Sequence, residues 1–147
     1  MKKKINILIV GLGWQQEFFI KKIYNNSNFY LIGLDKDPKP ICIKYLDKFI
    51  SCDTDNIEEC LFNINLTKRK IDHVITFNSE ALLILVAKLK KKLGINNGLK
   101  LNQIKNLINK YKIKEILNKN NIITQKYQIF KSKKKLEKIN INFPLIM

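Results

Sequence analysis

The sequence is poor in the residues that build metal sites and disulfide frameworks. It has three cysteines and one histidine in 147 residues. Cys42, Cys52 and Cys60 show no C-x-x-C spacing, and His73 lies among the apolar residues of a predicted strand. Zinc sites need clustered cysteine and histidine ligands, so we expect no metal site and a structural role for His73. The odd cysteine count without an export signal predicts free thiols in a reducing cytoplasm.

Long apolar runs and a cleavable leader are also missing. No run approaches the roughly 20 residues of a membrane-spanning helix. The lysine-rich start is followed by a short apolar run, but Gln15, Gln16 and Glu17 follow it and no small-residue cleavage site is present. We therefore expect a cytoplasmic protein without a membrane partner. The hydrophobic content of 46% predicts a packed globule rather than disorder.

Arginine and acidic residues are scarce, although the chain is strongly basic. Its net charge is +16, from 28 basic and 12 acidic residues, and Arg69 is the only arginine. Arginine is the usual reader of phosphates and guanine edges because of its bidentate fork. The lysines come with a surplus of isoleucine and asparagine, which adenine- and thymine-rich codons supply, so compositional bias explains the charge. We predict loose binding to polyanions and no specific nucleic-acid partner. Binding to nucleic acid with a sequence preference and a steep salt dependence would support the alternative, which is a protein whose function is to bind polyanions.

The chain does contain alternating strand-like and helix-like segments. Residues 4–10 form a near-continuous apolar run, which is typical of a strand buried on both faces of a parallel sheet. The sequence GLG follows, and residues 14–26 then carry apolar side chains at helical spacing. A second apolar run at 29–34 ends at Asp35. A strand, turn, helix and strand in about 30 residues have the length of a βαβ module.

The same alternation continues toward residue 98. We predict a third strand at 46–52 and a helix at 57–66, which Asp53, Thr54 or Asp55 can cap. A fourth strand at 71–77 and a helix at 78–94 follow. Asn78 or Ser79 can cap this second helix, and Gly94 can take the left-handed position at its end. Alternating strands and helices of this kind predict an α/β fold, with a Rossmann-like parallel sheet flanked by helices.

The pattern changes after Gly98. Residues 101–119 predict two short helices or one interrupted helix. The remaining predicted elements are a strand at 122–130, a short basic helix at 131–139 and the start of a strand at 143–147. We therefore divide the chain into a domain of residues 1–98 and a shorter segment of residues 99–147.

The stretch GLGWQQ lies between a predicted strand and a predicted helix, where dinucleotide-binding proteins carry G-x-G-x-x-G. Gly11 and Gly13 permit a tight turn and a close approach of a ligand to the helix N-terminus. Gln16 stands in place of the third glycine, and Asp35 ends the second strand where a ribose-binding carboxylate would lie. Two interpretations stay open. One is a nicotinamide site; the other is that the glycines only let the strand turn into its helix, while the aspartate begins a turn.

Several pieces follow one another in a set order. They are GLG after the first strand, LDKDP after the second, LDKF at the third, IDHVITFNSEA at the fourth, then LGI, NKYKIKEIL and finally FPLIM. This succession resembles the beginning of ATP-grasp enzymes, such as biotin carboxylases, carbamoyl-phosphate synthetase large chains and carboxylate–amine ligases. The resemblance covers essentially the whole chain and is clearest at residues 5–17 and 71–119. It implies a pre-ATP-grasp domain at 1–98 and the truncated beginning of an ATP-grasp lobe at 99–147.

The resemblance also implies a nucleotide contact. In the family, the segment similar to NKYKIKEIL usually begins with Asp-Lys, and its lysine reaches the bound nucleotide. Lys110 matches that lysine, whereas Asn109 replaces the aspartate. The alternative is that Lys110 is one more surface lysine. The strand similar to FPLIM normally ends in a second nucleotide-contacting lysine, which would be residue 148. We expect the phosphate loop and the magnesium-binding carboxylates to come later still, in a longer enzyme.

The implied chemistry is the activation of a small-molecule carboxylate by ATP and Mg²⁺ to an acyl phosphate, which an amine or similar nucleophile attacks. In the family, the front domain often contributes to binding the acid substrate, and loops at the carboxyl ends of parallel strands are the physical place for this. The candidates are Gly11 and the loop after it, with Gly13, then Asp35 and the loop after it, and the stretch from Thr76 to Glu80. Glu80 either contacts substrate or is only a partner of the helix dipole. We expect no catalytic residue, no metal, no tightly held cofactor and no ATP turnover in residues 1–147.

A self-contained Rossmann-like module that binds a nucleotide or NAD is the alternative from a different class. Tight NAD binding that depends on Asp35 would favour it. The acid and amine substrates do not follow from the sequence, because one front domain serves many reactions. A homodimer is left open.

Overall fold

The computed structural model describes residues 4–77 and 79–128. The chain forms two compact units, which divide between Ile104 and Lys105. The predicted domain division after residue 98 stays a prediction. Among the described residues, no helix has the length and apolar content that crossing a membrane requires.

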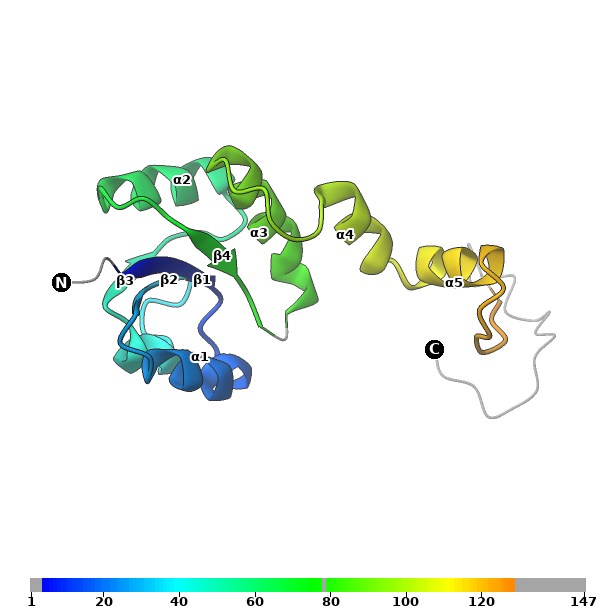
Figure 1. The fold of residues 1–147 in the computed structure, drawn as a ribbon, viewed down its shortest axis with the longest axis horizontal. Helices are drawn as coiled ribbons and strands as arrows, with labels where there is room; N and C mark the ends of the chain where they lie inside the picture. The colour runs from blue at the N-terminus through cyan, green and yellow to red at the C-terminus, as the bar shows by residue number, and fades with distance from the viewer. Residues whose placement is uncertain (1–3, 78, 129–147) are drawn as a thin grey trace. The chain divides into compact units, whose positions relative to one another are not determined.

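The first unit is built on a four-stranded parallel sheet (Figure 1). Its strands are β1 (Ile5–Val10), β2 (Phe29–Asp35), β3 (Lys48–Ser51) and β4 (His73–Ile75), in the order β3-β2-β1-β4. β1 lies at the centre, where Ile7 pairs with Leu31 on one side and with His73 on the other. The predicted α/β class and its parallel sheet are confirmed.

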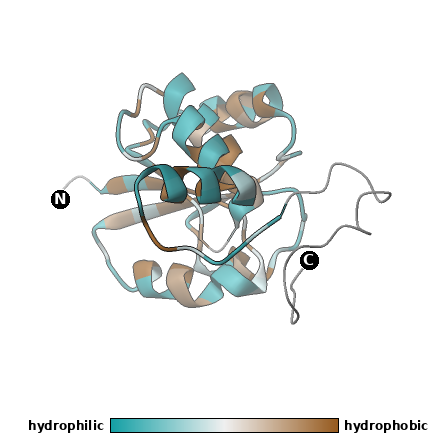
Figure 2. Ribbon diagram, turned by 90° about the vertical axis from the view of Figure 1, so that its right-hand side faces the viewer, coloured by the Kyte–Doolittle hydropathy of each residue, from teal (hydrophilic) through white to brown (hydrophobic). Residues whose placement is uncertain are grey.

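Helices cover both faces of this sheet (Figure 1). They are η1 (Trp14–Gln16), α1 (Glu17–Tyr24) and η2 (Ile41–Tyr45) on one side, and α2 (Ile57–Leu66) and α3 (Glu80–Lys92) on the other. In Figure 2 the strands carry brown, hydrophobic segments between helices that show both teal and brown turns.

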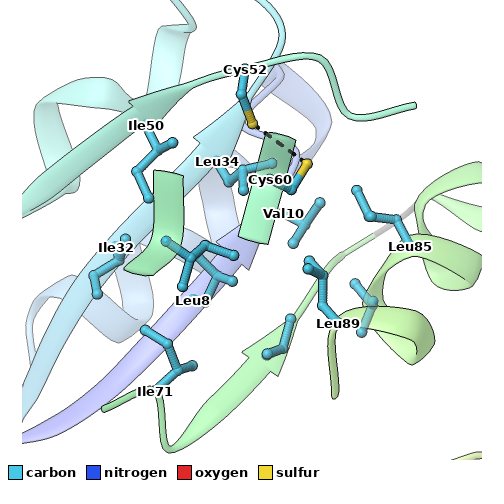
Figure 3. Packing of buried hydrophobic residues seen from close by; sticks show 13 residues of the cluster. Leu8, Val10, Ile32, Leu34, Ile50, Cys52, Cys60, Ile71, Leu85 and Leu89 are labelled. Atoms are coloured by element: carbon cyan, nitrogen blue, oxygen red, sulfur yellow. Dashed lines mark hydrogen bonds between the residues drawn. The ribbon is translucent and has the colours of Figure 1, made fainter. Parts of the chain in front are cut away.

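The core consists of two apolar layers, one on each face of the sheet. Successive side chains of a strand point to opposite faces, so Leu8 and Val10 pack toward α2 and α3 while Ile7 and Ile9 pack toward α1 and η2. Figure 3 shows the first layer, in which Leu8 and Val10 lie among side chains from the neighbouring strands and both helices. Because both faces are covered, the strands read as continuous apolar runs rather than as an alternation.

The thiols and the histidine have structural positions. Cys42, Cys52 and Cys60 are free and buried, as predicted for the thiols. Cys52 and Cys60 lie in the same layer, with their sulfur atoms 3.5 Å apart (Figure 3). His73 begins β4 at the surface, and its Nδ1 lies 3.1 Å from Nδ2 of Asn97.

Helix ends follow the predicted rules at one place and depart from them at another. Gly94 has φ +71°, and Ile95 N–H donates to the Lys90 carbonyl, so the predicted left-handed end of α3 is confirmed. The predicted cap of α2 is wrong. Asn56 is the cap residue, and its Oδ1 accepts a hydrogen bond from Glu59 N–H at 3.2 Å. Asp53 instead accepts from Asp55 N–H at 3.0 Å, which forms a turn before the helix.

The predicted cap of α3 has two candidates. Ser79 occupies the cap position, but its side chain makes no capping hydrogen bond. Asn78 lies outside the described residues.

The helices after Gly98 are two short ones, α4 (Leu101–Leu107) and α5 (Lys110–Lys119), which was the first of the two predicted alternatives. The predicted strand at 122–130 is wrong for its described part, because residues 122–128 form no strand. Ile122 N–H donates to the Leu117 carbonyl at 2.9 Å and closes the end of α5. Residues 129 and 130, the predicted basic helix at 131–139 and the predicted strand at 143–147 lie outside the described residues.

Candidate functional site

A hollow of about 410 Å³ lies at the carboxyl ends of the strands. Its lining includes Gly11 after β1, Asp35 at the end of β2, Thr54 after β3 and Ser79 before α3. Open parallel sheets bind ligands outside the carboxyl ends of their strands, where the strand order reverses. In this sheet the reversal falls between β1 and β4, because β2 and β3 follow on one side and β4 lies on the other. The hollow therefore has the expected position of a ligand site.

Gly11 fits the wall of this hollow only as glycine. Its φ is +86°, which side-chain-bearing residues rarely adopt. A Cβ at this position would lie 2.4 Å from both Gln16 Nε2 and Leu82 Cδ1. Gly13 differs, because its φ is −70° and a Cβ there would have no neighbouring atom within 4 Å. The tight turn, which the sequence assigns to both glycines, thus depends on Gly11, and Gly13 does not line the hollow.

Gln16 occupies the space over Gly11. Its side chain is 5% exposed, and its Oε1 accepts a hydrogen bond from Phe77 N–H at 3.2 Å. The amide thereby ties the turn after β1 to the segment between β4 and α3. In a complete dinucleotide fingerprint this position is a glycine that allows close helix–strand packing. Here the longer side chain fills that region, which argues against a pyrophosphate over Gly11.

Asp35 holds the loops that form the hollow. Its Oδ2 accepts from Leu12 N–H at 2.6 Å and its Oδ1 accepts from Asp37 N–H at 2.9 Å. Each carboxylate oxygen therefore already has a backbone donor. This geometry fits the interpretation in which Asp35 organises the turn, and it gives the residue a part in shaping the wall.

A second hollow of about 400 Å³ is lined by Thr76, Ser79, Glu80 and Leu83. Thr76 Oγ1 is buried and has no hydrogen-bond partner among the described residues. A buried hydroxyl without a partner is unfavourable by about 1–3 kcal/mol, so this oxygen is a candidate ligand contact. Glu80 is exposed at the first position of α3. Ser79 lines both hollows, so the two lie next to each other.

Three charged side chains of the first hollow were not singled out as ligand contacts by the sequence analysis. They are Lys36 after β2, Asp55 before α2 and Lys88 on α3. Within the described part of the chain, none of these side chains makes a hydrogen bond or an ion pair. One signal was present for Lys88, since it shares a helix face with Ala81 and Leu85 at spacings of seven and three residues. Lys36 lies in the loop after Asp35, which the position at a strand end favours, whereas nothing local distinguished Asp55.

The predicted nucleotide contact belongs to the second unit. Lys110 is the exposed first residue of α5. Asn109, which stands where the family usually has aspartate, caps this helix by accepting from Lys112 N–H at 3.1 Å. An asparagine and an aspartate are equally good caps, so the exchange preserves the helix start. The nucleotide role of Lys110 stays a prediction.

The thiols and the acidic side chains offer no further chemistry in the described residues. Burial raises the pKa of Cys42 to about 11 and that of Cys52 to about 12, and it raises the pKa of Cys60. Such thiols are poor nucleophiles because the thiolate is the reactive form. Over residues 4–77 and 79–128, no three histidine, cysteine, aspartate or glutamate side chains gather closely enough to hold a metal ion.

No protein-family model matches the sequence, and no curated protein matches it. Solved structures do match. L-amino acid ligase from Bacillus licheniformis is similar with a TM-score of 0.77 and 20% identity, over 96% of this chain and 36% of that one. Phosphoribosylglycinamide synthetase from Anaerococcus prevotii matches with a TM-score of 0.69 and 20% identity, over 92% of this chain and 34% of that one. N5-carboxyaminoimidazole synthetase from Staphylococcus aureus, complexed with ADP, matches with a TM-score of 0.60 and 19% identity, over 82% of this chain and 31% of that one.

The chain thus spans about a third of the length of these enzymes. At such identities the likeness concerns the fold, which is the one that the resemblance to ATP-grasp enzymes predicts. The chain therefore has the fold of the N-terminal part of the ATP-grasp ligases.

Proposed function

We propose that this chain is the N-terminal part of an ATP-grasp ligase, and that its first unit forms one wall of the substrate site. The complete enzyme would use ATP to activate a small-molecule carboxylate as an acyl phosphate for attack by an amine or similar nucleophile. The observation that carries this proposal is the pair of adjoining hollows at the carboxyl ends of a parallel sheet with this fold. The fold alone hosts many reactions, so the residues of the hollows support the binding role.

The residues of the first unit would bind and orient the substrate. Thr76 Oγ1 has a free hydrogen-bonding capacity at the wall of the second hollow. Lys36 and Lys88 offer positive charge in the first hollow. Cationic groups hold a carboxylate through charge-assisted hydrogen bonds, and a substrate held in one orientation reacts faster than one that moves freely.

The nucleotide would be contacted from the second unit. The ADP complex of the Staphylococcus aureus synthetase supports the use of ATP, and Lys110 is the proposed phosphate contact in residues 99–147. ATP supplies the phosphoryl group, and Mg²⁺ neutralises charge during its transfer. The described residues offer no cluster for Mg²⁺, so we assign its ligands to the complete enzyme and none to this unit.

Substitution of Thr76 tests the binding role. Thr76→Val removes an unpartnered buried hydroxyl, so without ligand we expect an unchanged or raised melting temperature. A panel of small carboxylates and amines, screened by thermal shift on the 147-residue chain, should contain compounds that stabilise the wild type. The same compounds should stabilise Thr76→Val less, and the control Thr124→Val in the second unit should behave like the wild type. A panel without effect, or equal effects on all three proteins, would contradict the proposal.

The NAD-binding module is the rival, and Gln16 argues against it because its side chain fills the region over Gly11. Calorimetric titration with NAD⁺ separates the two. We expect no saturable binding at concentrations up to about 1 mM. Tight binding that disappears in Asp35→Ala would favour the rival instead.

A further inference from the structure

We infer that the first hollow binds an α-amino acid with an apolar side chain. In this arrangement Asp55 contacts the ammonium group, Lys36 and Lys88 contact the carboxylate, and the apolar wall receives the side chain. This inference rests on the proposed function and deepens it, because it names the class of substrate.

The charges of the hollow match a zwitterion. Lys36, Asp55 and Lys88 come from three different segments and line one hollow of about 410 Å³. Their side chains have no hydrogen-bond or ion-pair partner within the described part of the chain. The carboxylate of Asp35 also reaches the wall, but both of its oxygens accept backbone N–H groups. Among the described residues, one unpaired acidic side chain and two unpaired lysine side chains therefore line the same hollow.

Other charge patterns fit this set less well. A phosphate or a dicarboxylate would pair with the two lysines but would leave Asp55 without a positively charged partner. An amine without a carboxylate would face Lys36 and Lys88 with a charge of the same sign. A ligand that carries both an ammonium and a carboxylate offers a partner to the free charges of both signs.

The rest of the wall is apolar. Ile57 of α2 and Leu82 and Leu85 of α3 line the hollow, and all three belong to the apolar layer over the sheet or pack against it. An aliphatic side chain gains from contact with this surface because the contact removes apolar area from water. Gln16 limits the space over Gly11, and the volume is at the lower end of the range of about 300–1,000 Å³ for small-molecule sites. These features fit a compact ligand rather than a dinucleotide.

Four compounds test this assignment on the 147-residue chain by isothermal titration calorimetry. L-Leucine carries all three recognised groups, while L-leucinol lacks the carboxylate, 4-methylpentanoate lacks the ammonium and glycine lacks the side chain. We expect leucine to bind at least about tenfold more tightly than each of the others, since each loses one recognised group.

Charge-neutral variants assign the contacts. Asp55→Asn should weaken the binding of leucine about tenfold and leave the affinity for 4-methylpentanoate unchanged. Lys88→Gln should weaken the binding of both leucine and 4-methylpentanoate and leave the affinity for leucinol unchanged. Glu58→Gln and Lys91→Gln are matched controls, because they remove exposed charges from α2 and α3 that do not line the hollow. Circular dichroism verifies that every variant is folded.

The outcomes separate this inference from the proposed function. If 4-methylpentanoate binds as tightly as leucine, or if Asp55→Asn leaves the preference unchanged, the amino-acid assignment is wrong while a carboxylate site remains. If neither leucine nor any other carboxylate binds, both the assignment and the proposed function fail.

Discussion

Gly11 shows how one residue serves the fold and the candidate site together. Its left-handed backbone lets β1 turn toward η1, and its missing side chain makes room for Gln16 and Leu82. Gln16 then reaches Phe77 N–H beyond β4. At the residue scale, the shape of the hollow depends on this small set of contacts.

We predict that Gly11→Ala lowers the free energy of unfolding by roughly 2–4 kcal/mol, because it combines a strained φ with displacement of the Gln16 amide. Urea denaturation measures this loss. Gly13→Ala is the matched control, since its backbone is ordinary and its surroundings are open, and it should stay within about 1 kcal/mol of the wild type. Equal effects of the two substitutions would contradict the proposed role of Gly11.

The buried thiols make stability depend on pH in the alkaline range. Burial raises the pKa of Cys42 to about 11 and that of Cys52 to about 12, whereas the pKa of a cysteine in the unfolded chain is about 8.5. The folded state therefore keeps its protons while the unfolded state loses them, so this contribution is complete below the unfolded pKa and is lost as pH rises toward the folded values.

We predict that the urea concentration at the midpoint of unfolding decreases as the pH is raised from about 8.5 to 10. A Cys42→Ala variant should show a smaller fall relative to its own value at pH 8, which separates the thiol from lysine titration. An identical pH profile in both proteins would show that Cys42 does not contribute.

At the scale of elements, the strands and most helices were predictable because their signals are local. β1 and β2 are apolar runs bounded by Gly11 and by Asp35, and α3 carries its end signal at Gly94. The strand expected at 122–130 is wrong over its described residues, 122–128, because β-rich composition does not supply a partner strand, and the backbone of Ile122 closes α5 instead.

The cap of α2 was missed for a related reason. Four successive residues, from Asp53 to Asn56, all have side chains that cap helices, so composition alone does not select one. The structure selects Asn56, because Asp53 is used in a turn with Asp55 N–H.

We predict that Asn56→Ala lowers the free energy of unfolding by about 1 kcal/mol, the usual cost of a lost cap. Asp55→Ala, which the sequence also offers as a cap, should change it by less than about 0.5 kcal/mol. Chemical denaturation of both variants decides between the two positions, and a larger loss for Asp55→Ala would show that the cap is assigned wrongly.

The candidate site was only partly predictable from sequence. Gly11, Asp35 and Thr76 stand at or next to strand ends, where topology alone directs attention, and Glu80 begins the helix after β4; all four line the two hollows. Lys36, Asp55 and Lys88 are brought together only by packing of segments far apart in the chain, and two of them are hidden among many surface lysines.

At the scale of the whole molecule, fold and charge lead to different expectations. The net charge of +16 favours loose attraction to any polyanion, which falls with added salt. The fold matches about a third of each solved structure compared, and the proposed substrate binding does not depend on net charge.

We predict that the purified chain neither hydrolyses ATP nor forms an acyl phosphate. With ATP, Mg²⁺, hydroxylamine and a carboxylate panel, neither ADP nor hydroxamate should rise above the protein-free control, because the resemblance to ATP-grasp enzymes assigns the phosphate loop and the magnesium-binding carboxylates to a longer enzyme. Formation of hydroxamate by this chain would place the catalytic machinery within residues 1–147.

The location of substrate binding tests the central claim most directly. In ¹H–¹⁵N correlation spectra of the 147-residue chain, titration with L-leucine should shift the amide signals of Gly11, Lys36, Asp55 and Ser79, at the carboxyl ends of the strands. The signals of Ile5 and Phe29, at the opposite ends, should remain in place. Shifts confined to those opposite ends, or no saturable shift at all, would contradict the account.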